Sequence, residues 1–102
     1  MYDIERFRNE NIFVVFENLD EANIFIDECA EYNIRNIFAI KALLESIVNN
    51  KLALVCGFLT SNAITYGNPF TYIKSRWTRV NAKDLIIMDV PSKESLIEFL
   101  DI

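Results

Sequence analysis

The side chains that most enzymes use for nucleophilic or acid–base chemistry are scarce in this chain. It contains no histidine, two cysteines (Cys29 and Cys56) and two glycines (Gly57 and Gly67). The lack of histidine excludes Ser-His-Asp and Cys-His catalysis and most zinc sites. Two isolated glycines cannot supply a GxGxxG or GxxxxGK[ST] phosphate loop. We therefore predict a protein that is not an enzyme, with no catalytic residue, no metal site and no cofactor.

The two cysteines are 27 residues apart and neither belongs to a CxxC pair. We interpret both as reduced thiols buried in the core. Cys29 falls on the apolar side of a predicted helix, where burial raises the pKa of a thiol. A thiol-dependent enzyme acting through Cys29 ranks third among the functions considered.

Residues 17–31 carry six acidic side chains and no basic one: Glu17, Asp20, Glu21, Asp27, Glu28 and Glu31. On a helix of about 100° per residue, Asp20, Asp27, Glu28 and Glu31 fall opposite the apolar side, and Ile24 falls at their centre. An apolar residue ringed by carboxylates resembles a contact anchor with a charged rim. A solvated helix face, or a neighbouring loop over Ile24, is the alternative. The DxDxDG spacing of a calcium loop is absent, so we predict a partner-binding surface of Asp20, Ile24, Asp27, Glu28 and Glu31.

A second candidate surface lies in residues 72–83, which combine aromatic and basic side chains: Tyr72, Lys74, Arg76, Trp77, Arg79 and Lys83. Aromatic rings that stack on bases, together with cations that meet phosphates, are typical of single-stranded nucleic-acid binding. The competing interpretations are packing of Trp77 against the core and a contact with a protein. We include Tyr72, Arg76, Trp77 and Arg79 among the predicted partner-binding residues. A nucleic-acid-binding accessory protein is the alternative function.

The composition indicates a small acidic globular protein. The chain has 102 residues, 52% of them hydrophobic, and a formal net charge of −5. This length fits one domain with its own core. No apolar run approaches the roughly 20 residues of a membrane span, and the first residues, MYDIERFRNE, are too charged for a secretory signal. A cytoplasmic protein without a membrane partner is therefore expected. Residues 1–31 carry nine acidic and two basic side chains, which favours a basic partner over a phosphate backbone.

The first half of the chain predicts a strand, a helix and an ambiguous segment. Residues 11–17 form an apolar run typical of an inner strand. Asn18 and Glu21 have the spacing of a capping box, and residues 19–32 show a helical period with Ala22, Phe25, Ile26, Cys29 and Ala30 on one face. For residues 34–49 we predict a short strand at about 34–38 and a helix over 41–49 that buries Leu43, Leu44, Ile47 and Val48. One continuous helix is the alternative.

The second half predicts mainly strands. We place strands at 51–60 and 62–66, a turn at 67–69, a mixture of strand and loop at 70–80, and a strand at 85–90. A last helix begins after Pro91, with Ser92 as its N-cap and Leu96, Ile97, Phe99 and Leu100 facing inward. Together these elements predict a single compact α+β domain over residues 1–102. Its mixed or mainly antiparallel sheet of four to five strands packs against two or three helices.

Three segments, NIFVVFENLDEANIFIDECAEYNI, AITYGNP and DLIIMDVPSKESLIEFLDI, resemble small phage- or prophage-encoded proteins of the anti-CRISPR type. The 14 isoleucines and 11 asparagines are typical of a low-GC genome. The chain departs from this pattern at 34–50, where it predicts a helix that such proteins often lack. The resemblance implies a stoichiometric inhibitor that binds a basic, nucleic-acid-handling surface of a host protein such as a CRISPR effector nuclease.

Overall fold

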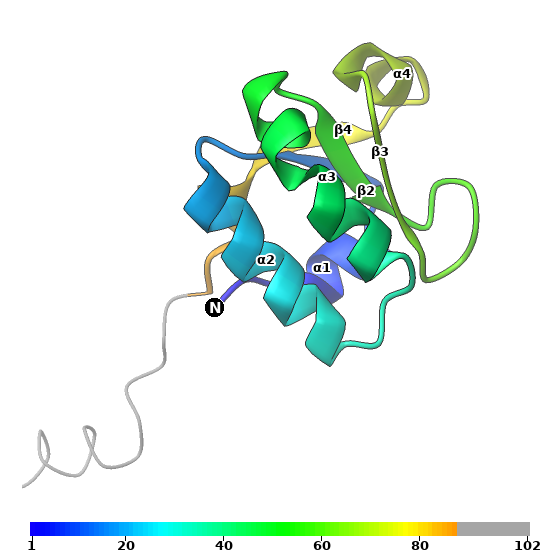
Figure 1. Ribbon diagram of the computed structural model, residues 1–102. Helices are drawn as coiled ribbons and strands as arrows, with labels where there is room; N and C mark the ends of the chain where they lie inside the picture. The colour runs from blue at the N-terminus through cyan, green and yellow to red at the C-terminus, as the bar shows by residue number, and fades with distance from the viewer. Residues whose placement is uncertain (88–102) are drawn as a thin grey trace, which may run out of the picture.

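The sheet is built from four short strands, β1 (Ile12–Val15), β2 (Ala53–Cys56), β3 (Ile64–Gly67) and β4 (Thr78–Asn81). The computed structural model describes residues 1–87 of the chain. The strands lie in the order β3-β2-β1-β4 (Figure 1). β1 pairs antiparallel with β2 and parallel with β4, and β2 pairs antiparallel with β3. The predicted α+β class and mixed sheet are therefore confirmed.

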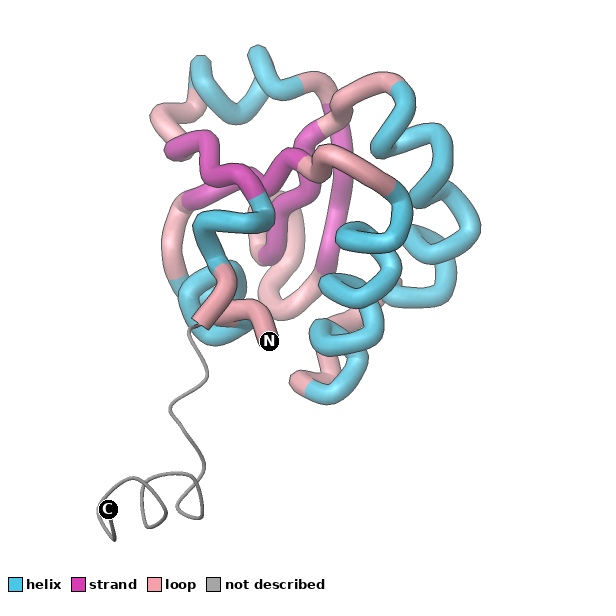
Figure 2. Tube along the Cα trace, turned by 90° about the vertical axis from the view of Figure 1, so that its left-hand side faces the viewer, coloured by secondary structure: helices cyan, strands magenta, loops and turns pink. Residues whose placement is uncertain are grey.

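The helices of residues 1–87 are α1 (Ile4–Asn9), α2 (Leu19–Glu31), α3 (Ile37–Asn49), α4 (Pro69–Lys74) and the short 3-10 helix η1 (Ala82–Leu85). The expectation of two or three helices was too low, because α1 and α4 were not predicted. α2 and α3 lie together on one side of the strands, and α4 lies away from them (Figure 2). Within the described residues, no helix is both long enough and apolar enough to cross a bilayer.

The alternation of side chains along β1 supplies two separate cores. Ile12 and Val14 face the larger core, which the sheet shares with α1, α2 and α3. Phe13 and Val15 face a smaller core on the other side, where Tyr72 of α4 covers the sheet. Every residue of β1 is buried because a core covers each face of the sheet there, and β1 is an inner strand, between β2 and β4. The predicted inner strand at 11–17 is thus confirmed.

The start of α2 is also as predicted. The Asn18 side chain accepts a hydrogen bond from the backbone N–H of Glu21 at 2.8 Å. The Glu21 carboxylate accepts one from the backbone N–H of Glu17 at 3.1 Å, one residue before the cap. Of the predicted inward face, Ala22, Phe25, Ile26 and Cys29 are buried, whereas Ala30 is exposed.

The strand predicted at 34–38 is wrong. Arg35 makes a single parallel bridge with Ala63, and the chain then enters α3 at Ile37. Asn36 adopts a left-handed conformation with φ of 68°, which ends the extended backbone after one residue. α3 buries Leu44 and Ile47 as expected, but Leu43 is 39% exposed.

The mixture of strand and loop predicted at 70–80 is replaced by α4 and β4. Asn68 caps α4, accepting a hydrogen bond from the backbone N–H of Phe70 at 3.0 Å, and Pro69 occupies the first turn. Proline suits this position because its missing N–H would have no helical partner there. β2 and β3 confirm the strands predicted at 51–60 and 62–66, but both are shorter than expected.

The strand predicted at 85–90 is wrong over its described part. Leu85 ends η1, and Ile86 makes one antiparallel bridge with Tyr2. This bridge, with a hydrogen bond from the Asp3 N–H to the Leu85 carbonyl at 2.7 Å, ties the first residues to η1. Residues 88–90 and the last predicted helix lie outside the described residues.

Candidate functional site

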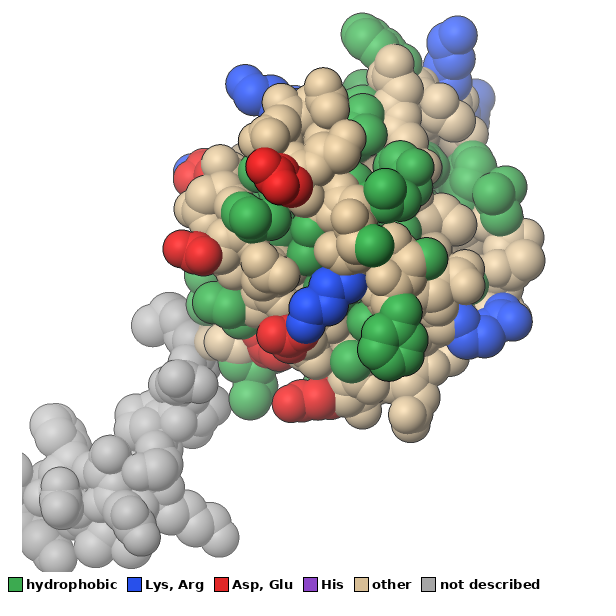
Figure 3. Space-filling model, in the orientation of Figure 1, with side chains coloured by type: hydrophobic (Ala, Val, Ile, Leu, Met, Phe, Trp, Pro, Cys, Tyr) green, Lys and Arg blue, Asp and Glu red, His purple; other side chains and the backbone are tan. Residues whose placement is uncertain are grey.

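The outer face of α2 carries the surface predicted to bind a partner. We define the acidic face as Asp20, Ile24, Asp27, Glu28 and Glu31. Ile24 is 54% exposed. The neighbours of Ile24 on the helix surface are the residues three and four positions before it and after it. All four of these residues are acidic: Asp20, Glu21, Asp27 and Glu28. The structure therefore places an exposed apolar residue among carboxylates. Acidic side chains lie along α2 in Figure 3.

The carboxylates of the acidic face are not equivalent. Asp27 pairs with the Lys41 ammonium of α3 at 2.6 Å. The partly buried Glu28 accepts a hydrogen bond from the backbone N–H of Tyr2 at 2.8 Å, and its second oxygen, Oε2, is buried without a partner among the described residues. Asp20 and Glu31 are exposed and make no hydrogen bond or ion pair within residues 1–87. These two carboxylates are therefore the most accessible to a partner.

The basic aromatic stretch does not form one surface. Tyr72 is 3% exposed and packs in the smaller core against Phe13 and Phe58, so the prediction that it contacts a partner is wrong. Burial raises the pKa of its hydroxyl. The hydrogen bond and ion pair that Lys83 makes with Glu17, at 3.1 Å, raise the pKa of Lys83.

The other cations of the stretch are exposed at the end of the molecule that carries α4. Lys74 ends α4, Arg76 follows it with a φ of 65°, and Arg79 lies on β4. None of the three is in an ion pair within residues 1–87. Basic side chains at this upper end of the molecule lie apart from the acids of α2 (Figure 3). The separation of the two charge types along the sequence is kept only in part, because Lys41 pairs with Asp27 and Lys83 pairs with Glu17.

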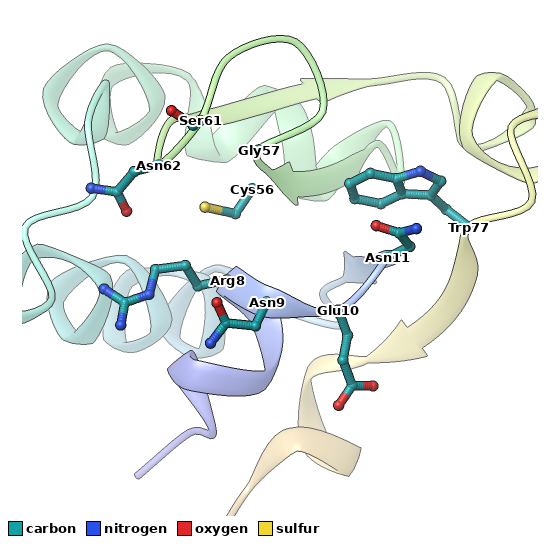
Figure 4. A pocket seen from close by; sticks show the side chains of 9 residues that line it. All are labelled: Arg8, Asn9, Glu10, Asn11, Cys56, Gly57, Ser61, Asn62 and Trp77. Atoms are coloured by element: carbon teal, nitrogen blue, oxygen red, sulfur yellow. The ribbon is translucent and has the colours of Figure 1, made fainter.

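Trp77 is half-buried at the rim of the smaller core. Its ring lies 5.3 Å from that of Phe58 and 6.4 Å from that of Tyr72. The remaining surface of Trp77 lines a polar pocket of about 540 Å³. In Figure 4 the side chains that line this pocket come from α1, the two residues before β1, the end of β2, the β2–β3 loop and the residue before β4.

Residues that were not predicted supply most of the polar groups of this pocket. Arg8 and Asn9 come from α1, Asn11 precedes β1, and Asn62 follows the loop after β2. Asn62 donates a hydrogen bond to the Asn33 carbonyl at 3.1 Å, which leaves its amide oxygen as an acceptor. The pocket thus offers three amides, the guanidinium of Arg8, the carboxylate of Glu10 and one indole, which suit a planar or hydrogen-bonding ligand. No sequence motif connects these residues, because the fold alone brings them together.

The two thiols are poor nucleophiles in this structure. Burial raises the pKa of Cys29, with smaller contributions from the neighbouring Cys56 and Glu28. Burial also raises the pKa of Cys56, although Arg8 lowers it in part. Both groups are therefore protonated at neutral pH, and the thiolate is the reactive form. Residues 1–87 hold no cluster of three or more acidic or sulfur ligands that would bind a metal.

No family model, curated protein or solved structure matches the chain. The resemblance to small phage proteins therefore depends on the sequence patterns alone, and the functional argument depends on the surfaces described above.

Proposed function

We propose that the protein is a non-enzymatic binding module that uses the acidic face of α2 to contact a basic surface of another protein. The observation that carries the proposal is the exposure of Ile24, 54% of whose surface is open to solvent. Exposed apolar residues are common singly. An isoleucine with acids at its neighbouring positions is different, because a partner that buries it must also meet the carboxylates.

The two kinds of side chain contribute differently to such a contact. Ile24 supplies apolar area that becomes buried in the complex, as in the centre of a protein interface. Asp20 and Glu31 remain near water and act mainly on the rate of association and on the choice of a basic partner. The net charge of −5 acts in the same direction.

The sequence patterns extend this proposal to a class of partner. A phage-borne protein of the anti-CRISPR type would act as a stoichiometric inhibitor. Its acidic face would occupy a basic surface on which a host defence nuclease, such as a CRISPR effector, holds nucleic acid. Carboxylates on a rigid helix compete for the Lys and Arg side chains that otherwise bind phosphates.

A pair of matched variants tests the acidic face. Ile24→Lys places a cation among the acids, and Ile73→Lys makes the same change on α4, where Ile73 is 53% exposed. Immobilised wild type, Ile24→Lys and Ile73→Lys are compared as baits in extract of the source bacterium or its host. The retained proteins are identified by mass spectrometry and assayed as nucleases with added wild-type protein.

We expect the wild-type and Ile73→Lys baits to retain a nucleic-acid-handling protein that the Ile24→Lys bait does not retain. The nuclease activity of that protein should fall when a stoichiometric amount of wild-type protein is added. Equal retention by all three baits would remove the acidic face from the proposal. Retention without inhibition would leave a binding module and reject the inhibitor.

The polar pocket favours a second candidate function, the binding of single-stranded nucleic acid. Its indole surface at Trp77 suits base stacking, and its amides suit base edges. Because Trp77 is the only tryptophan in the chain, its fluorescence reports binding directly. With a net charge of −5, we expect no saturable quenching by oligonucleotides at physiological salt. Saturable quenching there would favour this second candidate.

A further inference from the structure

The polar pocket beside Trp77 presents hydrogen-bond acceptors to a ligand. In Figure 4 the side-chain amides of Asn9, Asn11 and Asn62 turn their oxygens toward the middle of the pocket and their nitrogens away from it. Asn9 donates a hydrogen bond from its Nδ2 to the Glu5 carboxylate at 3.1 Å. The Nδ2 of Asn62 is likewise engaged, by a backbone carbonyl at 3.1 Å. These bonds fix which end of each amide faces the pocket, so the pocket favours a ligand that donates hydrogen bonds.

The charges that line the pocket are already compensated. Of the described residues, Arg8 and Glu10 are the charged ones in its lining; Arg8 pairs with Glu5, and Glu10 pairs with Arg6 at 3.2 Å. The Glu10 carboxylate points away from the other lining side chains (Figure 4). A phosphate would therefore find no unpaired cation among these side chains. Burial raises the pKa of the Cys56 thiol and the Arg8 charge lowers it in part, so a positive potential reaches the pocket and disfavours a cation. An uncharged ligand fits best.

Trp77 forms a flat wall beside the amide oxygens. The ring is half-buried against Phe58 and Tyr72, and its remaining surface lines the pocket. The Thr78 N–H donates a hydrogen bond to the Asn11 carbonyl at 2.9 Å, which holds Asn11 next to Trp77, and Figure 4 shows the amide beside the indole. An aromatic wall with acceptors at its side suits a flat ring that stacks on the wall and donates hydrogen bonds from its edge.

We infer that this pocket binds a free, uncharged nucleoside whose base carries an exocyclic amino group, as the bases of adenosine and cytidine do. The base stacks on Trp77, and its amino N–H groups donate to the amide oxygens. The pocket volume of about 540 Å³ lies within the range of small-ligand sites, roughly 300–1,000 Å³.

Charge distinguishes this ligand from a nucleic-acid strand. The net charge of −5 opposes the phosphates of an oligonucleotide, but a nucleoside has no phosphate. The inference is independent of the acidic face of α2. It differs from the second candidate function because the ligand is a free nucleoside and not a strand.

Nuclear magnetic resonance titration of the ¹⁵N-labelled protein tests the inference. The probes form two matched pairs, adenosine with inosine and cytidine with uridine, in which the second member has a carbonyl oxygen in place of the amino group. Trp77 is the only tryptophan in the chain, so its indole N–H gives one signal that reports on the pocket. Asn9→Ala and Asn11→Ala each remove an acceptor from an exposed position. Asn49→Ala is the control, since Asn49 is exposed on α3 and does not line this pocket.

We expect adenosine or cytidine to shift the indole signal with a dissociation constant of about 0.1–1 mM, and the matched probe without the amino group to bind roughly tenfold more weakly. The dissociation constant should rise about fivefold in Asn9→Ala and in Asn11→Ala and stay unchanged in Asn49→Ala. An indole signal that none of the four probes moves would overturn the inference. Equal binding within both pairs, or unchanged binding in both pocket variants, would do so as well.

Phosphate-bearing ligands separate the free nucleoside from a strand. The nucleoside that binds is compared with its own 5′-monophosphate and with a short single-stranded oligonucleotide of the same base at physiological salt. We expect both to bind more weakly than the nucleoside, because each brings phosphate charge to an acidic protein. Tighter binding of the monophosphate would reject the uncharged ligand. Tighter binding of the oligonucleotide would reject it too and would favour the second candidate function.

Discussion

The hydrogen bond between Glu28 and the backbone N–H of Tyr2 gives the sharpest test of how the N-terminal residues are held. The distance is 2.8 Å, and Tyr2 is itself 6% exposed and packs edge-on against Phe25 at 5.2 Å. In Glu28→Ala the N–H loses a charged acceptor, and hydrogen bonds to charged groups contribute about 1.5–3 kcal/mol. Because Glu28 is only partly buried, we expect Glu28→Ala to lower the free energy of unfolding by about 1–2 kcal/mol.

Two further variants separate the hydrogen bond from a general effect of charge. Glu28→Gln keeps an oxygen acceptor for Tyr2 but places an amide group near the buried site of Oε2. It should therefore lower the free energy of unfolding about half as much as Glu28→Ala does. Glu31→Ala removes an exposed acid from the same helix and should stay within about 0.5 kcal/mol of wild type. Urea denaturation followed by circular dichroism measures all three. With m of about 1–2 kcal/mol/M, Glu28→Ala should lower the midpoint by about 1 M.

A loss of stability in Glu28→Ala that is no larger than that in Glu31→Ala would refute this reasoning. The hydrogen bond from Tyr2 to Glu28 would then add nothing to the free energy of unfolding beyond what a hydrogen bond from Tyr2 to water supplies. Exchange of the Tyr2 amide provides an independent measurement, because its protection should fall in Glu28→Ala and remain in Glu31→Ala.

Three other predictions address the candidate sites. Replacing Asp20 and Glu31 by Lys should slow association with a basic partner and flatten its salt dependence in stopped-flow measurements; an unchanged rate would contradict the acidic-face contact. Cys29→Ala and Cys56→Ala should keep binding activity and lose about 1 kcal/mol of stability each in thermal denaturation, whereas a folded Cys29→Ala protein without activity would indicate thiol chemistry. Trp77→Ala should cost about 2 kcal/mol in urea denaturation, since the side chain is half-buried; a neutral substitution would show that its ring contacts do not support the fold.

Local signals in the sequence were sufficient to predict α2. Its cap depends on Asn18 and Glu21, three residues apart, and its buried face repeats with the helical period. β1 was predictable for a similar reason, because its continuous apolar run matches a strand covered on both faces. In these elements the local preference and the tertiary contacts agree.

The elements that were predicted wrongly are those in which short segments fit two structures. Ile34, Phe38 and Ile40 alternate as in a strand, but the left-handed Asn36 ends the extended backbone and the helical period of α3 prevails. α4 had a usable signal, because asparagine before proline is a common helix start; we interpreted that pair as a turn. α1 has six residues, of which only Ile4 and Phe7 are buried, so its apolar pattern is too short to identify.

The candidate site was predicted in its position but not in its partners. The helical period correctly places Ile24 and the neighbouring acids on the exposed side of α2. The helical period cannot show that Lys41, 14 residues from Asp27, neutralises the Asp27 carboxylate. Nor can it show that the backbone N–H of Tyr2, 26 residues from Glu28, donates a hydrogen bond to the Glu28 carboxylate. The polar pocket depends in the same way on residues that are far apart in the sequence.

These partners change the balance expected within the acidic face. Asp27 pairs with Lys41, and Glu28 accepts a hydrogen bond from the backbone N–H of Tyr2. The two carboxylates that remain are Asp20, about one helical turn before Ile24, and Glu31, about two turns after it. Exposed carboxylates at such distances are screened by salt and contribute little to affinity. In the proposed complex Ile24 would become fully desolvated, and burying its exposed half would be worth about 1 kcal/mol. The affinity should therefore respond more to Ile24→Ala than to Asp20→Lys, and the association rate should respond in the opposite order.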